Sequence, residues 1–343
     1  MANIIIPPGW QSKDSESTSR SAYDSRRTFI KTLGLGSIGV IGGWSYACSD
    51  EDRIREVVRV ADRPDGPLGT IPQDAPRAGL PADRNTLYKV GEREISDRIA
   101  ASSYNNFYEF DGSSKEIWHL TDEYDPFPTV LKVRGEVEEE FEIDVFELIE
   151  SMAIEERLYR FRCVEAWSLT VPWSGFPLAK LIERCRPTSK AEFVRFVSIS
   201  DKKQMPGVAN QPWYKWPYYE ALRIDEAMNP VAFMATGMYG EPLPKQNGSP
   251  MRVVLPWKYG YKGAKAVREI EFTRRQPKTF WNDLAPSEYS FLSNINPNVP
   301  HPRWSQASER FISSLESVRR IPTTMFNGYG EWVGSMYPDE PRS

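Results

Sequence analysis

Short apolar segments, rather than long ones, most constrain what this chain can fold into. From Tyr104 onward, β-type runs of five to nine residues alternate with short helical candidates, and Asp144 is placed to be the N-cap of the first of these. The β-type runs are 129–137, 157–163, 193–198, 252–256 and 267–273, and the helical candidates are 144–152, 177–184 and 223–228. The 28 prolines and the 13% aromatic content favour a loop-rich fold over a helical bundle. Because strands and helices interleave without a regular period or a repeat, we predict one α+β domain with mixed sheets and interleaved helices over 104–335.

The first 47 residues have the pattern of an export signal. Residues 25–31 read SRRTFIK, a twin-arginine motif, and 16 uncharged residues follow, five of them glycine. That stretch is too short and too rich in glycine for a membrane span. Ser45 and Ala47 are the small residues that favour cleavage before Cys48, and lipidation of Cys48 is an alternative. We therefore expect a twin-arginine signal peptide at 1–47 and export of the folded protein to the periplasm.

Composition argues against several functional classes. The chain has 43 basic and 47 acidic residues, so nothing suggests a nucleic-acid footprint. Two histidines, three cysteines and the lack of a C-x-x-C-H motif argue against zinc clusters, iron–sulfur clusters and c-type haem.

We expect His119 at the surface and Cys185 inside a packed helix. Residues 48–103, charged and with Pro/Gly clusters, are interpreted as a linker and a peripheral N-terminal arm, and 336–343 as a C-terminal tail.

Cys163 is the first candidate functional residue. It stands at the end of a β-type run, within the segment 159–168 (YRFRCVEAWS). A lone cysteine in such a place is by default a buried apolar residue. The flanking arginines, and Glu165 two positions later, would instead suit a thiolate held in a polar pocket at the strand end. The local sequence leaves both interpretations open.

Two later segments combine glycines with basic residues. They are 246–252 (QNGSPMR) and 257–265 (WKYGYKGAK), which together hold one arginine and three lysines. Backbone N–H groups at glycine turns, close to fixed positive charge, can form a phosphate cradle. The spacing is not that of a P-loop, and a solvated basic loop is the alternative.

Five segments in a fixed order connect this chain to a known family. They are 104–110 (YNNFYEF), 162–168 (RCVEAWS), 246–248 (QNG), 254–260 (VLPWKYG) and 301–307 (HPRWSQA). With them the chain resembles the molybdenum-pterin catalytic subunits of periplasmic protein-methionine-sulfoxide reductases, within the sulfite oxidase-fold family. The resemblance runs from the leader to about Gly330. It implies a sulfite oxidase-like molybdopterin-binding fold.

The resemblance also implies site residues. Cys163 matches the single protein thiolate that binds molybdenum and is the catalytic residue, in keeping with the stability that a soft anionic sulfur donor gives a high-valent metal. The other matches are cofactor-binding positions: Asn105, Tyr108, Glu109, Ser198, Asn247, Arg252, Gly263, Ala264 and Lys265. No further basic loop for a nucleotide is apparent, so the implied cofactor is Mo-molybdopterin in its mononucleotide-free form.

Four residues near these motifs keep two interpretations each. Glu165, Trp167 and Trp304 either line the mouth of the metal pocket or belong to the packed core. His301 either orients the pterin or caps a turn.

The activity implied by the resemblance is repair of oxidised methionine in periplasmic proteins, by oxygen-atom transfer from the sulfoxide to molybdenum. A sulfite-oxidising or other small-oxoanion enzyme of the same fold is the alternative, and a non-catalytic binding protein is a third possibility that an intact Cys163 disfavours. Each turnover needs two electrons, and the chain has no flavin or nicotinamide fingerprint of the G-x-G-x-x-G type. The family suggests a haem-containing membrane subunit (MsrQ-like), linked to the quinone pool, as the electron donor.

Overall fold

Two β-sheets form the framework of the described part of the chain. The computed structural model describes residues 65–88, 91 and 93–340, all of which belong to one compact unit. The predicted signal peptide 1–47, with Cys48 and the first part of the predicted linker, lies outside the described residues. The first sheet has five strands in the order β2-β1-β10-β5-β6. The second has seven strands, in the order β12-β11-β4-β7-β8, with β3 paired to β4 and β9 paired to β7.

The strands of the first sheet are β1 (Val130–Gly135), β2 (Phe141–Asp144), β5 (Phe193–Ser198), β6 (Tyr219–Arg223) and β10 (Val267–Thr273). Those of the second sheet are β3 (Glu155–Arg162), β4 (Trp167–Pro177), β7 (Phe233–Met238), β8 (Glu241–Pro242), β9 (Arg252–Val254), β11 (Ser308–Ile312) and β12 (Val318–Pro322). Two pairings are parallel, β1 with β10 and β4 with β11, and each joins strands that are far apart in the sequence. The remaining pairings between strands are antiparallel.

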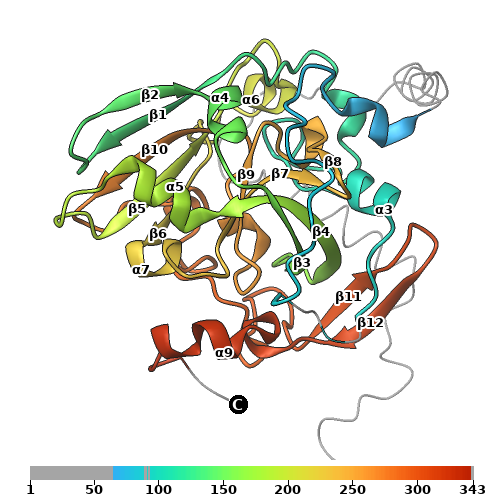
Figure 1. The fold of residues 1–343 in the computed structure, drawn as a ribbon. Helices are drawn as coiled ribbons and strands as arrows, with labels where there is room; N and C mark the ends of the chain where they lie inside the picture. Colours follow the sequence, from blue (N-terminus) through green and yellow to red (C-terminus); the bar gives the residue numbers. More distant parts are fainter. Residues whose placement is uncertain (1–64, 89–90, 92, 341–343) are drawn as a thin grey trace, which may run out of the picture. The chain divides into compact units, whose positions relative to one another are not determined.

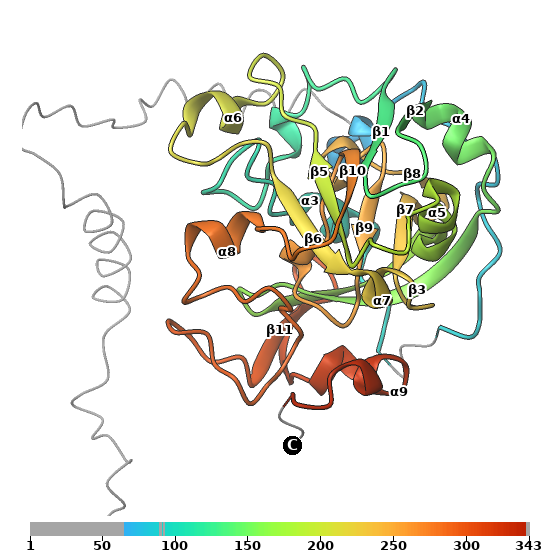
Figure 2. The same ribbon diagram turned by 90° about the vertical axis from the view of Figure 1, so that its left-hand side faces the viewer.

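Short helices connect and cover the sheets. The α-helices are α3 (Arg98–Ser103), α4 (Val145–Glu150), α5 (Leu178–Cys185), α6 (Pro206–Asn210), α7 (Ile224–Ala227), α8 (Phe280–Leu284) and α9 (Gly330–Val333). The 3-10 turns are η2 (Gly66–Thr70), η3 (Trp118–Leu120), η4 (Lys245–Asn247), η5 (Gly260–Lys262), η6 (Met325–Gly328) and η7 (Gly334–Met336). In Figure 1 the strands β1, β2, β5 and β10 form one group and β3, β4, β11 and β12 another. Figure 2 shows α4 and α5 on one side of the sheets and α6 and α8 on the other. Within the described residues, no helix has the length and apolar content needed to cross a membrane.

The predicted α+β class is confirmed, and several elements form for the reasons expected. The Asp144 carboxylate accepts hydrogen bonds from Phe146 N at 2.8 Å and Glu147 N at 3.1 Å, so it is the N-cap of α4. In β5, buried and half-buried positions alternate, as in a strand with one face in the core. Helix α5 buries Cys185, as predicted, and ends where Arg186 adopts a left-handed conformation with φ of 48°.

The last residues of the predicted N-terminal arm are part of the core rather than peripheral. Ala100 and Ala101 of α3 are fully buried within the main hydrophobic cluster. Ser96 Oγ donates a hydrogen bond to Ile312 O at 2.7 Å and accepts one from Thr170 N at 3.0 Å. These contacts place the residues just before 104 against the second sheet.

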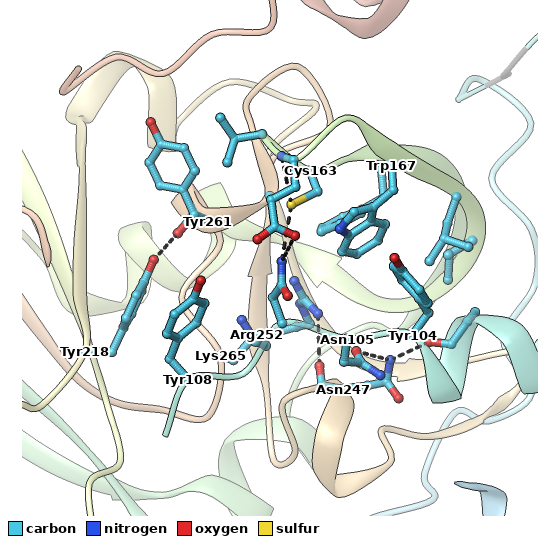
Figure 3. Close-up of a pocket in the computed structure, with 18 of the residues that line it drawn as sticks. Tyr104, Asn105, Tyr108, Cys163, Trp167, Tyr218, Asn247, Arg252, Tyr261 and Lys265 are labelled. Atoms are coloured by element: carbon cyan, nitrogen blue, oxygen red, sulfur yellow. Dashed lines mark hydrogen bonds between the residues drawn. The ribbon is translucent and has the colours of Figure 1, made fainter. Parts of the chain in front are cut away.

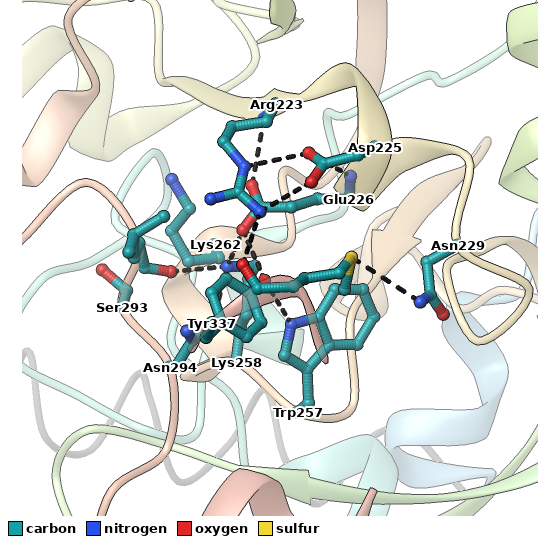
Figure 4. A network of polar contacts seen from close by, with 12 residues as sticks. Arg223, Asp225, Glu226, Asn229, Trp257, Lys258, Lys262, Ser293, Asn294 and Tyr337 are labelled. Carbon is teal, nitrogen blue, oxygen red and sulfur yellow. Dashed lines mark hydrogen bonds and ion pairs between the residues drawn. The ribbon is translucent and has the colours of Figure 1, made fainter. Parts of the chain in front are cut away.

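A buried polar network holds the end of the described chain against α7 (Figure 4). Lys258 Nζ lies 2.6 Å from Glu226 Oε1 and donates to Asn294 Oδ1 at 2.8 Å. The Tyr337 hydroxyl donates to the same Glu226 oxygen and accepts from Trp257 Nε1 at 3.0 Å. Both charged side chains are fully buried, so each is balanced only by its partners in the network.

Candidate active site

A pocket with about 860 Å³ of empty space, part of it open to solvent, lies where α3, β4, β9 and the 104–109 segment meet. It brings together most of the site residues predicted from the sequence (Figure 3). Seven of the predicted residues line it: Asn105, Tyr108, Glu109, Cys163, Asn247, Arg252 and Lys265.

Cys163 is the residue that follows β3, in the tight turn to β4. Cys163 N donates to Trp167 O at 2.9 Å, and Ala166, with a left-handed φ of 64°, reverses the chain between them. The thiol is almost fully buried and faces the pocket. Burial, reinforced by the nearby Glu165 carboxylate, raises the pKa of the Cys163 thiol to about 12. A thiolate at this position therefore requires a cationic partner such as a bound metal.

Asn106, which was not predicted as a site residue, donates a side-chain hydrogen bond to this sulfur. Asn106 Nδ2 lies 3.4 Å from Cys163 Sγ and 3.2 Å from Glu165 Oε2. Lys115 Nζ donates to Asn106 Oδ1 and lies 2.6 Å from Glu165 Oε2. Lys115 thus fixes the amide so that its N–H group points at the sulfur. In the sequence, only its place beside Asn105 distinguishes Asn106.

Two asparagines join α3 to the pocket. Asn247 Nδ2 donates to Ala101 O at 3.0 Å and to Asn105 Oδ1 at 3.2 Å, and Asn105 Nδ2 donates to Ser102 O at 2.9 Å. Asn247 is followed by Gly248, whose φ of 106° is one that a residue with a Cβ rarely adopts. A Cβ on Gly248 would lie 3.0 Å from Cβ of Lys265, so this glycine allows the two basic segments to meet.

Two cations face the pocket without a carboxylate in hydrogen-bonding contact. Arg252 donates from Nη1 to Asn247 O at 3.1 Å, and burial lowers its pKa to about 10. Burial, together with the neighbouring Arg252, lowers the pKa of Lys265, while burial raises the pKa of the fully buried Glu109 carboxyl. Within the described residues, Lys265 Nζ makes no hydrogen bond and lies 4.9 Å from the centre of the Phe107 ring. Arg252 and Lys265 would therefore stabilise an anion bound between them.

The other two lysines of the predicted cradle are not in the pocket, so that part of the prediction is wrong. Lys258 pairs with Glu226 at 2.6 Å and Lys262 with Glu220 at 2.7 Å, and these side chains are all buried. Core carboxylates hold them because a buried ammonium is stable only when it is paired.

Ser198, Gly263 and Ala264 do not line the pocket. Ala264 O accepts a hydrogen bond from Val253 N at 2.9 Å, which holds this segment against β9. A Cβ on Gly263 would collide with Val253 O, so only glycine fits there. Ser198 Oγ is buried and has no hydrogen-bond partner among the described residues. The cofactor-binding roles of these three residues stay predictions.

Of the four residues with two interpretations, two line the pocket and two do not. Glu165 and Trp167 line the pocket. Trp304 does not: its Nε1 donates to Val164 O at 2.8 Å, and its ring stacks on His301 with centroids 3.8 Å apart. His301 accepts from Arg303 N at 3.2 Å, as expected for a residue that caps a turn.

His119, predicted at the surface, is instead buried beside Trp118 in η3, with ring centroids 5.9 Å apart. The surface prediction was wrong because a histidine without a motif carries no sequence signal of its burial.

The pocket fits a molybdenum-pterin cofactor on its own chemistry. Several polar atoms of its wall, among them Asn247 Oδ1, Arg252 Nε and Trp173 Nε1, are buried without a hydrogen-bond partner among the described residues. A ligand with polar edges and an anionic end would satisfy them. The described part of the chain contains no cluster of three or more His, Cys, Asp or Glu side chains that could hold a metal ion. A metal bound at Cys163 would thus take its remaining ligands from the cofactor.

Fold and site together define a molybdopterin-binding oxidoreductase. The family model described as "Oxidoreductase molybdopterin binding domain" matches residues 121–281, which confirms the predicted cofactor class. The catalytic subunit MsrP of the protein-methionine-sulfoxide reductase of Burkholderia mallei is 43% identical over 326 residues, 94% of this chain and 92% of that protein. MsrP of Xanthomonas axonopodis pv. citri is 42% identical over 327 residues, covering 94% of each chain. The chain belongs to the family of these MsrP catalytic subunits.

Among solved structures, the sulfane dehydrogenase SoxCD of Paracoccus pantotrophus gives a TM-score of 0.40 at 16% identity. It covers 57% of this chain and 50% of that one, a likeness too partial to support a conclusion.

Proposed function

We propose that this protein is the catalytic subunit of a periplasmic reductase that repairs methionine sulfoxide in proteins. The observation that supports it most directly is a buried thiol, Cys163, facing a pocket whose two cations, Arg252 and Lys265, make no hydrogen bond to a carboxylate among the described residues. The relatives that share 41–43% of its residues are named as protein-methionine-sulfoxide reductases.

Five of the predicted residues have a task that their position in the pocket allows. Cys163 Sγ would bind molybdenum as a thiolate, with the Asn106 amide holding its orientation. Arg252 and Lys265 would hold the phosphate end of the pterin, while Asn105 and Asn247 would meet its polar edge. The bound cofactor supplies oxygen-atom transfer and two-electron redox chemistry.

The protein's own contribution is to bind and orient the sulfoxide. Tyr108, Glu165 and Trp281 are partly exposed members of the pocket wall, so they lie where a substrate would enter. The overall reaction consumes a sulfoxide, two electrons and two protons, and yields a thioether and water.

The compartment, the form of the cofactor and the electron donor complete the proposal. The twin-arginine segment 25–31 supports export of a folded protein to the periplasm. The lack of a further basic loop in the sequence supports a cofactor without a nucleotide. Electrons would come from a haem-containing membrane subunit (MsrQ-like) that docks transiently, as small electron-transfer interfaces usually do.

The deciding experiment is an assay of purified, molybdenum-loaded protein with a reduced dye as donor. Peptide methionine sulfoxide should be reduced, and sulfite should not be oxidised when an electron acceptor is supplied instead. Oxidation of sulfite without reduction of the sulfoxide would replace the proposal by the sulfite-oxidising alternative. For the electron donor, membranes with and without the haem subunit are compared with a quinol as the only reductant; equal activity in both would exclude that subunit.

A further inference from the structure

An array of aromatic rings runs from the pocket wall to the protein surface. The Tyr108 ring lies 4.9 Å from Trp281 and 6.0 Å from Tyr214, and the Tyr214 ring lies 6.1 Å from Trp213 (centroid distances). Tyr108 and Trp281 line the pocket, Tyr214 is half-buried, and Trp213 is 66% exposed. Trp213 is the most exposed of the described aromatic residues. The array thus begins in the pocket and ends in solvent.

The loop that carries Trp213 is fixed to the pocket segment. Gln211 Nε2 donates to Tyr108 O at 3.0 Å, and Val208 N donates to Glu109 O at 3.0 Å. A Cβ on Gly207 would collide with Tyr108 O, so helix α6 packs directly on this backbone. The backbone of the loop that carries the exposed Trp213 indole is therefore held in place.

The far side of the same loop is also held. Trp216 Nε1 donates to Gln211 O at 3.0 Å, and Lys215 Nζ lies 2.9 Å from Asp283 Oδ2 of α8. Figure 2 shows α6 and α8 on the same side of the molecule. An exposed tryptophan on a loop that is already held in place has little backbone freedom left to lose on binding, and tryptophan is common among the residues that dominate interfaces.

Resting on the proposed function, we propose that Trp213 and Tyr214 form a binding platform for the polypeptide that flanks the methionine sulfoxide of a protein substrate. The sulfoxide side chain enters the pocket past Tyr108 and Trp281, and the rest of the substrate chain must leave along the surface. The two ring-to-ring steps from Tyr108 to Trp213, each of about 6 Å, correspond to roughly three or four residues of extended chain. An apolar side chain a few residues from the sulfoxide can then pack on the indole.

The position of the array favours the substrate over the electron donor as its occupant. A peptide substrate must pass the pocket mouth, and the array is continuous with two rings of the pocket wall. An electron donor needs only to come close to the metal and has no need of a path into the pocket.

The test compares two substrates in dye-driven assays of the molybdenum-loaded protein. Trp213→Ala should lower kcat/KM for an oxidised, unfolded protein by about tenfold, chiefly through KM. With free methionine sulfoxide, which is too small to reach the platform, the same variant should match the wild type. Trp213→Phe should recover part of the loss because it keeps an apolar ring. The matched control is Trp332→Ala, which removes a 37% exposed tryptophan that packs on Tyr88; it should affect neither substrate.

Four results would overturn the proposal. Unchanged kinetics of Trp213→Ala with both substrates would show that the platform is not used, and an equal loss with both would show a structural role. A loss seen only when a membrane donor replaces the dye would assign the surface to the electron donor. A wild-type protein that reduces neither sulfoxide would overturn the proposed function itself, and the platform with it.

Discussion

Replacing Lys258 by methionine should destabilise the fold sharply. Lys258→Met removes the ammonium but keeps a side chain of similar length, and so leaves the Glu226 carboxylate buried without its cation. Breaking a buried ion pair from one side costs about 3–5 kcal/mol. With an unfolding entropy of about 2.1 cal/mol/K per residue, this loss lowers the melting temperature of a domain of roughly 270 residues by roughly 5–9 °C.

The measurement is calorimetric and urea-induced unfolding of the cofactor-loaded protein at pH 7. Two further variants separate burial from simple loss of charge. Lys258→Met/Glu226→Leu removes both charges and should recover most of the stability. Lys278→Met breaks an exposed ion pair with Asp283, 2.8 Å long, and should cost less than about 1 kcal/mol. The reasoning is refuted if Lys258→Met is no less stable than Lys278→Met, or if the double variant is no more stable than the single one.

Four further outcomes are expected. Cys163→Ser should leave the melting temperature of the apoprotein within about 2 °C of wild type but abolish sulfoxide reduction, since a hydroxyl is a poor ligand for a soft metal site; a dye-driven assay measures this, and substantial residual activity would contradict the role of Cys163. Arg252→Ala and Lys265→Ala should each lower the molybdenum content, because each loses a charge-assisted contact of about 1.5–3 kcal/mol; full metal content in both would place the cradle elsewhere. Gly263→Ala should lower both the melting temperature and the metal content, because its Cβ meets a backbone oxygen of β9; wild-type values in calorimetry and metal analysis would argue against this. Burial acts to raise the pKa of Glu226, but Lys258 and the hydrogen-bond donors around the carboxylate hold that pKa below its usual value. The stability that Glu226 contributes is therefore present above about pH 4.3 and is lost as the pH falls through the lower pKa of the folded state. Thermal unfolding between pH 6 and 3 should show a steeper loss of stability for wild type than for Glu226→Gln.

What the sequence revealed of the fold depended on how each strand is buried. Strand β5 buries one face, so its alternation was visible, and β10 was predicted with its observed bounds. Strand β4 is buried at ten of its eleven positions, and β7 at all six, so neither has the alternation by which a strand is recognised. Alternation could therefore reveal β5 and β10, which bury one face, but not β4 and β7, which are buried on both.

The candidate site shows the same limit. The local sequence made Cys163, Arg252 and Lys265 candidates with an alternative left open for each, and the resemblance to a known family assigned them to the site. Asn106 and Trp281 did not, because an amide or an indole acquires a role only when folding places it beside a pocket formed by distant segments. Nor could the sequence show that lysines a few positions apart would divide between the pocket and the core, since an irregular loop has no periodicity from which the direction of a side chain can be inferred.

The parallel pairing of β1 with β10 has a consequence for how the chain reaches this structure. Val133 lies opposite Ile270, so more than a third of the chain must be synthesised and brought back before this ladder can close. Closing so large a loop makes folding slow, and until β10 arrives β1 presents an unpaired edge to other molecules. The pocket shares this dependence, because its wall draws on residues from Ala101 to Tyr289. A site able to bind the cofactor is therefore among the last features to form. A chain truncated before β10 would be prone to aggregate rather than fold as a smaller version of this protein.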